Sequence, residues 1–156
     1  MTTKRFLSFD DHQTQLARIH RQMANDEYKP DVIVGIVRGG LIPAVGISHY
    51  YDVPLYTINV SFRDTKIQGG LEQLFGLLDE GKKVLLVDDI CDSGETLQHI
   101  YDATKSVFNG ELPENLKTAV LVHNEGCNRV NTPDYYGLEI NKIVKNEWIV
   151  FFWEQD

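Results

Sequence analysis

The chain has 156 residues, with 15 lysine and arginine residues against 23 aspartate and glutamate residues, for a formal net charge of −8. This balance argues against a protein whose main task is to hold a nucleic-acid backbone, and the length suits one domain with a sizeable core. Two cysteines without CxxC spacing favour a reducing compartment. Because no signal peptide or transmembrane run is found, we expect a cytoplasmic protein without membrane or nucleic-acid partners.

In chain order, the first predicted elements are a helix and a buried strand. The helix begins near Ser8–Asp11 and carries apolar residues at helical spacing. These residues are Leu16, Ile19 and Met23. Residues Asp31–Val37, DVIVGIV, then form an apolar run typical of a parallel strand covered on both faces. Strands that alternate with helical segments predict an α/β protein without a second domain.

An arginine and two glycines follow this strand. Arg38, Gly39 and Gly40 stand where the strand leaves the core. The glycines allow a backbone that exposes N–H groups to an anion, and the guanidinium adds charge-assisted hydrogen bonds. Taken alone, the three residues favour an ordinary left-handed turn. Their place one strand–helix unit before the acidic motif described below favours an anion site instead.

Residues Val53–Gly70 are predicted as a short strand followed by a long polar stretch. Loops of this length in compact domains are commonly lids, so we expect a flexible loop at about 61–72. Its cations Arg63 and Lys66 are candidates for contacting an anion, although solvated surface charge explains either one taken separately. Residues Leu71–Leu78 are predicted as a short helix.

The most informative stretch is Val84–Leu97, VLLVDDICDSGETL. Its apolar run Val84–Val87 predicts a buried parallel strand, and Asp88 and Asp89 stand where that strand is expected to leave the core. Unpaired carboxylates are costly in a dry interior. We therefore expect both to meet solvent, a cation or hydroxyl groups at the carboxyl end of the strand, where open α/β sheets bind ligands.

A tight turn into a helix follows the carboxylates. It consists of Asp92, Ser93, Gly94, Glu95 and Thr96. The N–H groups of the first helical turn, the close backbone approach at the glycine and the two hydroxyls can hold a phosphate without any lysine. Two hydroxyl-binding carboxylates beside a phosphate site predict a ribose 5-phosphate ligand. The alternative is an ordinary strand-to-helix connection with an Asp or Ser N-cap.

Aromatic residues gather in Asn146–Glu154, NEWIVFFWE. The indole of Trp148 suits stacking on a flat heteroaromatic ring, while backbone groups beside it can read the edge of a base. The alternative for Trp148 is a core aromatic. Trp153 is expected in the core or at a subunit interface.

The stretch Val84–Leu97 resembles the phosphoribosyl pyrophosphate (PRPP) signature of type I phosphoribosyltransferases, and Asn146–Glu154 is similar to the base-binding end of the xanthine-guanine and hypoxanthine branch. The resemblance implies an α/β fold with a mostly parallel central sheet flanked by helices and a small hood built from the terminal segments. Residues 1–156 would be a single domain with a hood at about 124–156. The implied activity is transfer of 5-phosphoribosyl from PRPP to N9 of hypoxanthine, guanine or xanthine. The implied cofactor is Mg²⁺, and the implied assembly is a homodimer or homotetramer.

The resemblance also implies roles for individual residues. The ribose of PRPP would contact Asp88 and Asp89, with Asp89 also near Mg²⁺ held mainly by PRPP and water. The 5-phosphate would bind at Asp92, Ser93, Gly94, Glu95 and Thr96. The pyrophosphate would bind at Arg38, Gly39, Gly40, Arg63 and Lys66, and the base at Ile90, His123, Trp148 and Ile149. Catalysis would fall to Asp92, which accepts or positions a purine-ring proton, and to Arg38, which stabilises the leaving group.

One position departs from the branch. His123 stands where a lysine usually contacts the exocyclic oxygen of a 6-oxopurine. A neutral imidazole accepts or donates one hydrogen bond whereas lysine only donates, so the preference among bases can differ. A histidine bonded to nearby backbone explains the residue equally well.

Three alternatives stay open from the sequence. Asp92 can be a purely structural N-cap. A PRPP- or nucleotide-binding regulator of the same fold is disfavoured because the chain is acidic and has no spare length for a helix-turn-helix domain. A pyrimidine phosphoribosyltransferase is disfavoured by the Trp148–Ile149 pair.

Overall fold

The computed structural model describes residues 2–61, 66–126 and 132–154. The helices and strands follow one another as β1 (Thr3–Leu7), α1 (Phe9–Asn25), β2 (Val32–Val37), α2 (Leu41–Tyr51), β3 (Leu55–Val60), β4 (Ile67–Gly69), α3 (Leu71–Asp79), β5 (Val84–Cys91), α4 (Glu95–Val107), β6 (Leu116–Asn124), β7 (Tyr135–Ile140), β8 (Glu147–Phe151) and a 3-10 helix (Phe152–Glu154). Strands and helices alternate through most of this order, as predicted for an α/β protein.

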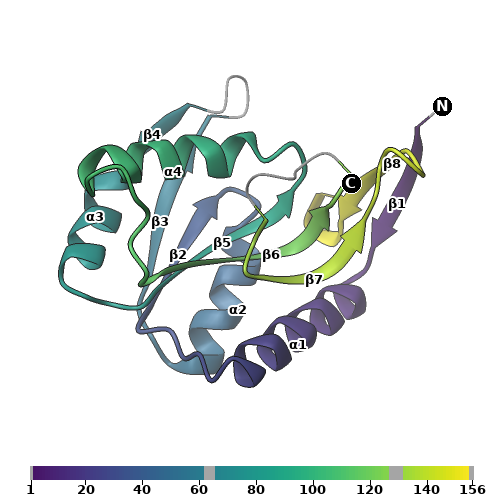
Figure 1. Ribbon diagram of the computed structural model, residues 1–156. Coiled ribbons are helices and arrows are strands. Elements are labelled where there is room, and N and C mark those ends of the chain that lie inside the picture. The colour runs from purple at the N-terminus through teal and green to yellow at the C-terminus, as the bar shows by residue number, and fades with distance from the viewer. Residues whose placement is uncertain (1, 62–65, 127–131, 155–156) are drawn as a thin grey trace.

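The central sheet has the strand order β4-β3-β2-β5-β6-β7, and only the β3–β4 pair is antiparallel. Helices α1 and α2 cover one face, and α3 and α4 cover the other (Figure 1). Strands β1 and β8 form a separate two-stranded parallel sheet in which Thr3 pairs with Glu147 and Leu7 with Phe151. The mostly parallel sheet and the hood built from the terminal segments are therefore confirmed.

The run Val84–Val87 is apolar throughout because its side chains point alternately into two core layers. Leu85 and Val87 pack into the core layer beneath α1 and α2, whereas Val84 and Leu86 pack into the layer beneath α3 and α4. All four residues are buried. A central parallel strand faces helices on both sides, so every side chain must be apolar.

The predicted start of the first helix is confirmed. Ser8 is the N-cap of α1: its hydroxyl accepts a hydrogen bond from the Asp11 amide at 3.1 Å, and the Asp11 carboxylate accepts one from the Ser8 amide at 2.8 Å. This reciprocal pair is a capping box and satisfies two amide groups that the helix itself leaves without partners. The predicted short helix at Leu71–Leu78 is confirmed as α3.

The structure differs from the sequence-based boundaries in three places. Strand β5 continues through the two aspartates to Cys91, because its backbone keeps pairing with β6 as far as His123. Within the stretch expected to be loop, Ile67–Gly69 pairs with β3 as β4, and α3 begins at Leu71, while residues 62–65 lie outside the described part. Strand β7 belongs to the central sheet although it falls within the range expected for the hood.

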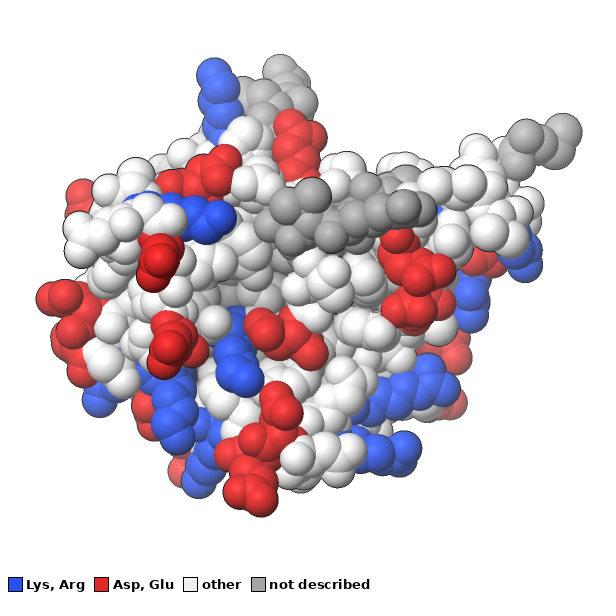
Figure 2. Space-filling model, viewed as in Figure 1, with Lys and Arg blue, Asp and Glu red and all other residues white. Residues whose placement is uncertain are grey.

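Charged side chains are mixed on the surface. Figure 2 shows acidic and basic groups interspersed over one face of the molecule. In the described part of the chain, each helix is too short or too polar to cross a lipid bilayer.

Candidate functional site

A cavity of about 920 Å³ lies at the carboxyl ends of β2 and β5. These strands are parallel neighbours, with Val34 opposite Leu86 and Gly35 opposite Val87, so the loops that follow them leave the same edge of the sheet. The cavity is lined by residues 36–39, 41–42, 60–61, 88–97 and 153–154. The arginine–glycine loop and the acidic motif are separated in sequence but line the same cavity. In open α/β sheets, ligands bind at this edge, beyond the carboxyl ends of the strands.

Asp88 and Asp89 line this cavity from the last part of β5. The Asp89 amide donates to Asp88 Oδ1 at 2.8 Å, and the Ile90 amide donates to Asp89 Oδ1 at 2.8 Å. Burial raises the pKa of both carboxyl groups, and the neighbouring Asp89 charge raises that of Asp88 further. Hydroxyl donors or a cation would therefore stabilise the charged forms of both carboxylates. The sequence predicts these same partners for the pair.

The arginine–glycine loop is pressed against these carboxylates. A Cβ atom at Gly39 would overlap Asp89 Oδ2 and lie 2.6 Å from Asp89 Cγ. A Cβ atom at Gly40 would lie 2.5 Å from the Ile36 carbonyl oxygen and 2.6 Å from that of Val87. Gly40 meets backbone atoms, so only glycine fits there, whereas a Cβ at Gly39 would displace the Asp89 side chain. Arg38, which begins the loop, is exposed and lines the cavity.

The turn after β5 enters α4 through a left-handed glycine. Gly94 has φ 83°, and the Ser93 hydroxyl accepts a hydrogen bond from the Glu95 amide at 3.3 Å. Residues 92–97 all line the cavity. The first amide groups of a helix have no partners inside it and carry its positive dipole end, so this turn is suited to an anion.

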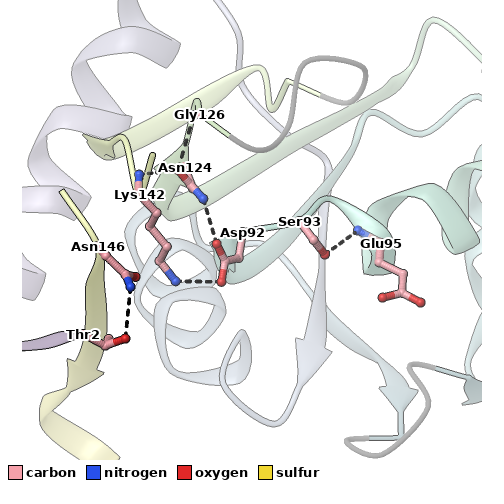
Figure 3. Close-up of polar contacts among 8 residues, drawn as sticks. All are labelled: Thr2, Asp92, Ser93, Glu95, Asn124, Gly126, Lys142 and Asn146. Carbon is pink, nitrogen blue, oxygen red and sulfur yellow. Dashed lines mark hydrogen bonds and ion pairs between the residues drawn. The ribbon is translucent and has the colours of Figure 1, made fainter. Parts of the chain in front are cut away.

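Asp92 is held on both of its carboxylate oxygens. Asn124 Nδ2 donates to Oδ1 at 2.9 Å, and Lys142 Nζ lies 2.7 Å from Oδ2 (Figure 3). Lys142 belongs to the connection between β7 and β8, and its Nζ also lies 5.3 Å from the ring centroid of Trp148. Sequence reasoning missed Lys142, because a single lysine in a turn carries no motif.

The expected base-binding residues are not all brought together. Ile90 lines the cavity, whereas Ile149 is buried in the core layer beneath α1 and α2. His123 is 3% exposed and packs against Tyr136 at 5.2 Å between ring centroids. Trp148 is 57% exposed and lies outside the cavity lining; Lys142, whose Nζ is 5.3 Å from its ring centroid, contacts Asp92, which lines the cavity.

Of the two other expected cations, only Lys66 belongs to the described residues. The Lys66 carbonyl accepts a hydrogen bond from the amide of Ser61, which lines the cavity, but Lys66 does not line it. Arg63 lies outside the described residues.

The chain after β8 supplies a wall that sequence reasoning did not assign to the site. Trp153 stacks on Phe151 at 4.6 Å, with 6° between the ring planes, and packs against the core as expected, but it also lines the cavity together with Glu154. Burial and the Asp89 charge raise the pKa of Glu154, while Arg38 opposes them. The cavity is thus enclosed by segments from both halves of the sequence.

Comparisons with known proteins agree with this geometry. Residues 7–155 match the family described as the phosphoribosyl transferase domain. The chain is 30% identical over 149 residues, 95% of this chain and 82% of the relative, to the xanthine-guanine phosphoribosyltransferase of Chromohalobacter salexigens. It is 28% identical over 141 residues, 83% of this chain and 76% of the relative, to the hypoxanthine-guanine phosphoribosyltransferase of Dictyostelium discoideum.

Solved structures show the same relationship. The purine phosphoribosyltransferase of Pyrococcus horikoshii superposes with a TM-score of 0.69 at 34% identity, covering 99% of this chain and 96% of that one. The xanthine-guanine-hypoxanthine phosphoribosyltransferase of Helicobacter pylori superposes with a TM-score of 0.74, covering 99% of this chain and 94% of that one, but at 20% identity it shows the fold alone. The carboxylate pair, the glycine-rich loops and these matches together place the chain in the phosphoribosyltransferase domain family.

Proposed function

We propose that this protein is a purine salvage enzyme that transfers the 5-phosphoribosyl group of PRPP to N9 of a 6-oxopurine and releases pyrophosphate. The observation that carries the proposal is one cavity lined by Asp88 and Asp89, the turn 92–96 and the arginine–glycine loop. These parts match the three portions of PRPP: ribose hydroxyls, 5-phosphate and pyrophosphate. The relatives named as xanthine-guanine and hypoxanthine-guanine phosphoribosyltransferases support a purine acceptor.

The ribose and its 5-phosphate are held by the β5–α4 segment. Asp88 and Asp89 accept hydrogen bonds from the ribose hydroxyls, which relieves the cost of two adjacent carboxylates in a buried position. The 5-phosphate lies against the start of α4, where Ser93, Thr96 and the first helical amides donate. This arrangement fixes C1 of the ribose between the arginine–glycine loop and Asp92.

The leaving pyrophosphate is stabilised by Arg38 and by the amide group of Gly39, both of which line the cavity. The expected contact at Gly40 is not available, because its amide donates to the Ile36 carbonyl oxygen at 2.9 Å and the residue lies outside the lining. Donors fixed before the reaction stabilise negative charge as it develops on the leaving group. The donor set also fits Mg²⁺, because Asp89 offers carboxylate oxygen at the wall of the cavity and PRPP and water can supply the remaining oxygens. Bound Mg²⁺ would neutralise part of the pyrophosphate charge.

The base enters on the side of Asp92. As the bond from C1 to pyrophosphate breaks, positive charge develops on the sugar and purine N9 attacks C1, as in the oxocarbenium-like states of glycoside chemistry. The Asp92 carboxylate accepts or positions a proton of the purine ring, at N7. The exposed indole of Trp148 offers a stacking face for the ring beyond Lys142.

The deciding experiment measures pyrophosphate release from PRPP and Mg²⁺ with hypoxanthine, guanine, xanthine, adenine, uracil and orotate. Turnover with a 6-oxopurine that disappears in the Asp88→Asn/Asp89→Asn double variant is the expected result. Turnover only with uracil or orotate would establish a pyrimidine enzyme. PRPP binding without turnover of any base would establish a regulator of the same fold.

The role of Asp92 is tested separately. An Asp92→Asn variant should fold normally and lose most turnover, because the amide cannot accept a proton as the carboxylate does. Normal turnover at unchanged stability would reduce Asp92 to a structural residue at the start of α4.

From the resemblance to the family, we also propose that the protein acts in the cytoplasm as a homodimer or homotetramer. Light scattering coupled to size-exclusion chromatography measures the mass directly. A mass of one 17.8 kDa chain at assay concentration would contradict this assembly.

A further inference from the structure

Asn124 and Asp92 lie next to each other at the carboxyl ends of neighbouring strands. Cys91 of β5 pairs with His123 of β6, and Asp92 and Asn124 are the residues that come next on the two strands. Side chains alternate between the two faces of a sheet, so the residues that follow a paired position share a face. The strand register therefore brings the Asn124 amide to the Asp92 carboxylate, where Nδ2 donates to Oδ1 at 2.9 Å (Figure 3).

The Asn124 side chain can face Asp92 in only one orientation. Its oxygen accepts hydrogen bonds from the backbone amides of Lys142 at 3.1 Å and of Gly126 at 3.3 Å. A side-chain amide turned by half a rotation would place its NH₂ group against these two N–H donors and its oxygen against a carboxylate. Because Asn124 is fully buried, hydrogen bonds left unmade there would be costly. The donor is thus held toward Asp92.

Three segments of the chain meet at this side chain. Asp92 follows β5, Gly126 follows β6, and Lys142 lies in the connection between β7 and β8. Lys142 Nζ also lies 2.7 Å from Asp92 Oδ2, so each carboxylate oxygen has its own partner. A lysine ammonium is a compact charge on a flexible stem, whereas the planar amide of Asn124 is fixed at its oxygen. We therefore attribute the direction of the Asp92 carboxylate to Asn124.

The start of α4 does not account for the way in which Asp92 is held. Gly94, which has φ 83°, is the N-cap of this helix. The two oxygens of Asp92 are directed to Asn124 and Lys142 instead of to the first helical amides. A group that accepts a proton from a substrate needs a fixed direction, because small displacements of a reacting group cost much of its effect. The contacts around Asp92 meet this need.

We propose that Asn124 is the positioning residue of the proposed proton acceptor: its buried amide aims the Asp92 carboxylate and ties that aim to the place of the β7–β8 connection. This inference rests on the proposed function and deepens it. Asn124 lies outside the cavity lining, so its effect on turnover passes through Asp92. The expected signature is a loss of kcat with little change in KM for PRPP.

The test replaces Asn124 with a side chain of the same shape that lacks the donor. Asn124→Asp keeps an oxygen for the amides of Lys142 and Gly126 but sets a second carboxylate against Asp92. Asn124→Ala removes both kinds of hydrogen bond. The comparison of the two variants separates the aim of the Asp92 carboxylate from the support of the backbone.

Asn141→Asp is the matched control. Asn141 has the same pattern of hydrogen bonds as Asn124: its Nδ2 donates to Glu125 Oε1 at 3.1 Å, and its oxygen accepts from the backbone amides of Ile143 at 3.0 Å and Val144 at 3.3 Å. The carboxylate that it contacts belongs to Glu125, which does not line the cavity. The control thus makes the same chemical change beside a carboxylate outside the site.

The measured quantities are kcat and KM for PRPP, with hypoxanthine as the base, across the neutral pH range. Near pH 8, Asn124→Asp should lose about 10- to 100-fold in kcat, because a displaced general base loses much of its effect. As the pH falls, the introduced carboxyl group takes up a proton, since burial and the Asp92 charge raise its pKa. It then donates to Asp92 as the amide did, so kcat should recover relative to wild type. Asn141→Asp should keep the wild-type kcat at each pH.

Two results would overturn the proposal. One is a wild-type kcat for Asn124→Asp near pH 8. The other is an equal, pH-independent loss of kcat in Asn124→Asp and Asn124→Ala, which would make Asn124 a support of the fold alone.

An NMR measurement that needs no turnover separates this inference from the proposed function, and it also applies if the Asn124 variants do not fold. In wild type, the side-chain amide protons of Asn124 should exchange slowly with water, and their resonance should move upfield in Asp92→Asn, which removes the charged acceptor. If these results are obtained while wild type turns over no base, the proposed function alone fails. Exchange as fast as that of the exposed Asn146, or an unchanged resonance in Asp92→Asn, overturns the role of Asn124.

Discussion

A methyl group added at Gly39 should disable the proposed PRPP site while leaving the fold largely intact. In the Gly39→Ala variant, the new Cβ would overlap Asp89 Oδ2, so the Asp89 carboxylate must turn away from its present position. That movement breaks the hydrogen bond of 2.8 Å from the Ile90 amide. The substitution therefore acts on one of the two carboxylates proposed to hold the ribose.

The magnitudes follow from what each added Cβ meets. Losing one hydrogen bond costs Gly39→Ala about 1 kcal/mol of stability, and losing the proposed ribose contact of a charged group costs about 2 kcal/mol of PRPP binding, which is roughly thirtyfold in KM. Gly40→Ala meets backbone carbonyls of two strands, which cannot move independently, and should lose about 1–3 kcal/mol of stability. Gly76 in α3 has nothing within 4 Å of its added Cβ, so Gly76→Ala should gain about 0.5–1 kcal/mol.

The assay pairs urea unfolding with steady-state kinetics at varied PRPP. The three variants should separate: Gly76→Ala is more stable with wild-type KM, Gly39→Ala has near-normal stability with a raised KM for PRPP, and Gly40→Ala is clearly destabilised. A Gly39→Ala protein with the wild-type KM for PRPP would show that the observed position of Asp89 does not matter for binding. If the Gly39→Ala variant unfolds at as low a urea concentration as Gly40→Ala, the distinction between a side-chain contact at Gly39 and backbone contacts at Gly40 is refuted.

Three further predictions concern pH, the base and the metal. Burial lowers the pKa of His20, whose ring stacks on Tyr50 with 3.9 Å between ring centroids. The unfolded chain therefore binds a proton at this histidine more readily than the folded chain does. The contribution of His20 to stability is present above pH 6.5 and declines as the pH falls toward the lowered pKa. Thermal unfolding of His20→Gln should therefore depend less on pH below 6.5 than that of wild type, and equal slopes would contradict the assignment. Trp148→Ala should change the free energy of unfolding by less than about 0.5 kcal/mol, because the indole is 57% exposed, yet raise KM for the base; an unchanged KM would remove the indole from the base site. Excess EDTA should abolish pyrophosphate release and added Mg²⁺ should restore it, whereas full activity in EDTA would exclude a role for the metal.

The central site could be predicted because its signal is local. The run Val84–Val87 marks a strand covered on both faces, and the polar residues that follow must then lie at the edge of the sheet. The predicted end of the strand was too early, since Asp88, Ile90 and Cys91 keep their places opposite β6. Backbone pairing does not depend on side-chain polarity, so the strand extends through the carboxylates that define the site.

The parts that could not be predicted from pattern depend on distant contacts. In β1 four of five residues are exposed, and its pairing with β8 joins Thr3 to Glu147, so no periodicity marks it; only the family resemblance implied the hood. Lys142 reaches Asp92 because Asn124 holds the backbone of its turn, a relation among three separate segments. Such a relation is set by packing and leaves no trace in the spacing of residues.

The β1–β8 sheet joins the two ends of the chain, so it forms only after the β5–α4 segment has been synthesised. Residues 84–97, which include the turn proposed to bind phosphate, are synthesised while β1 still has no partner strand. At about 5–20 residues per second, ribosomes need roughly 7–28 s to travel from β1 to β8. The turn proposed to bind phosphate is therefore synthesised before the strand that completes the terminal two-stranded sheet.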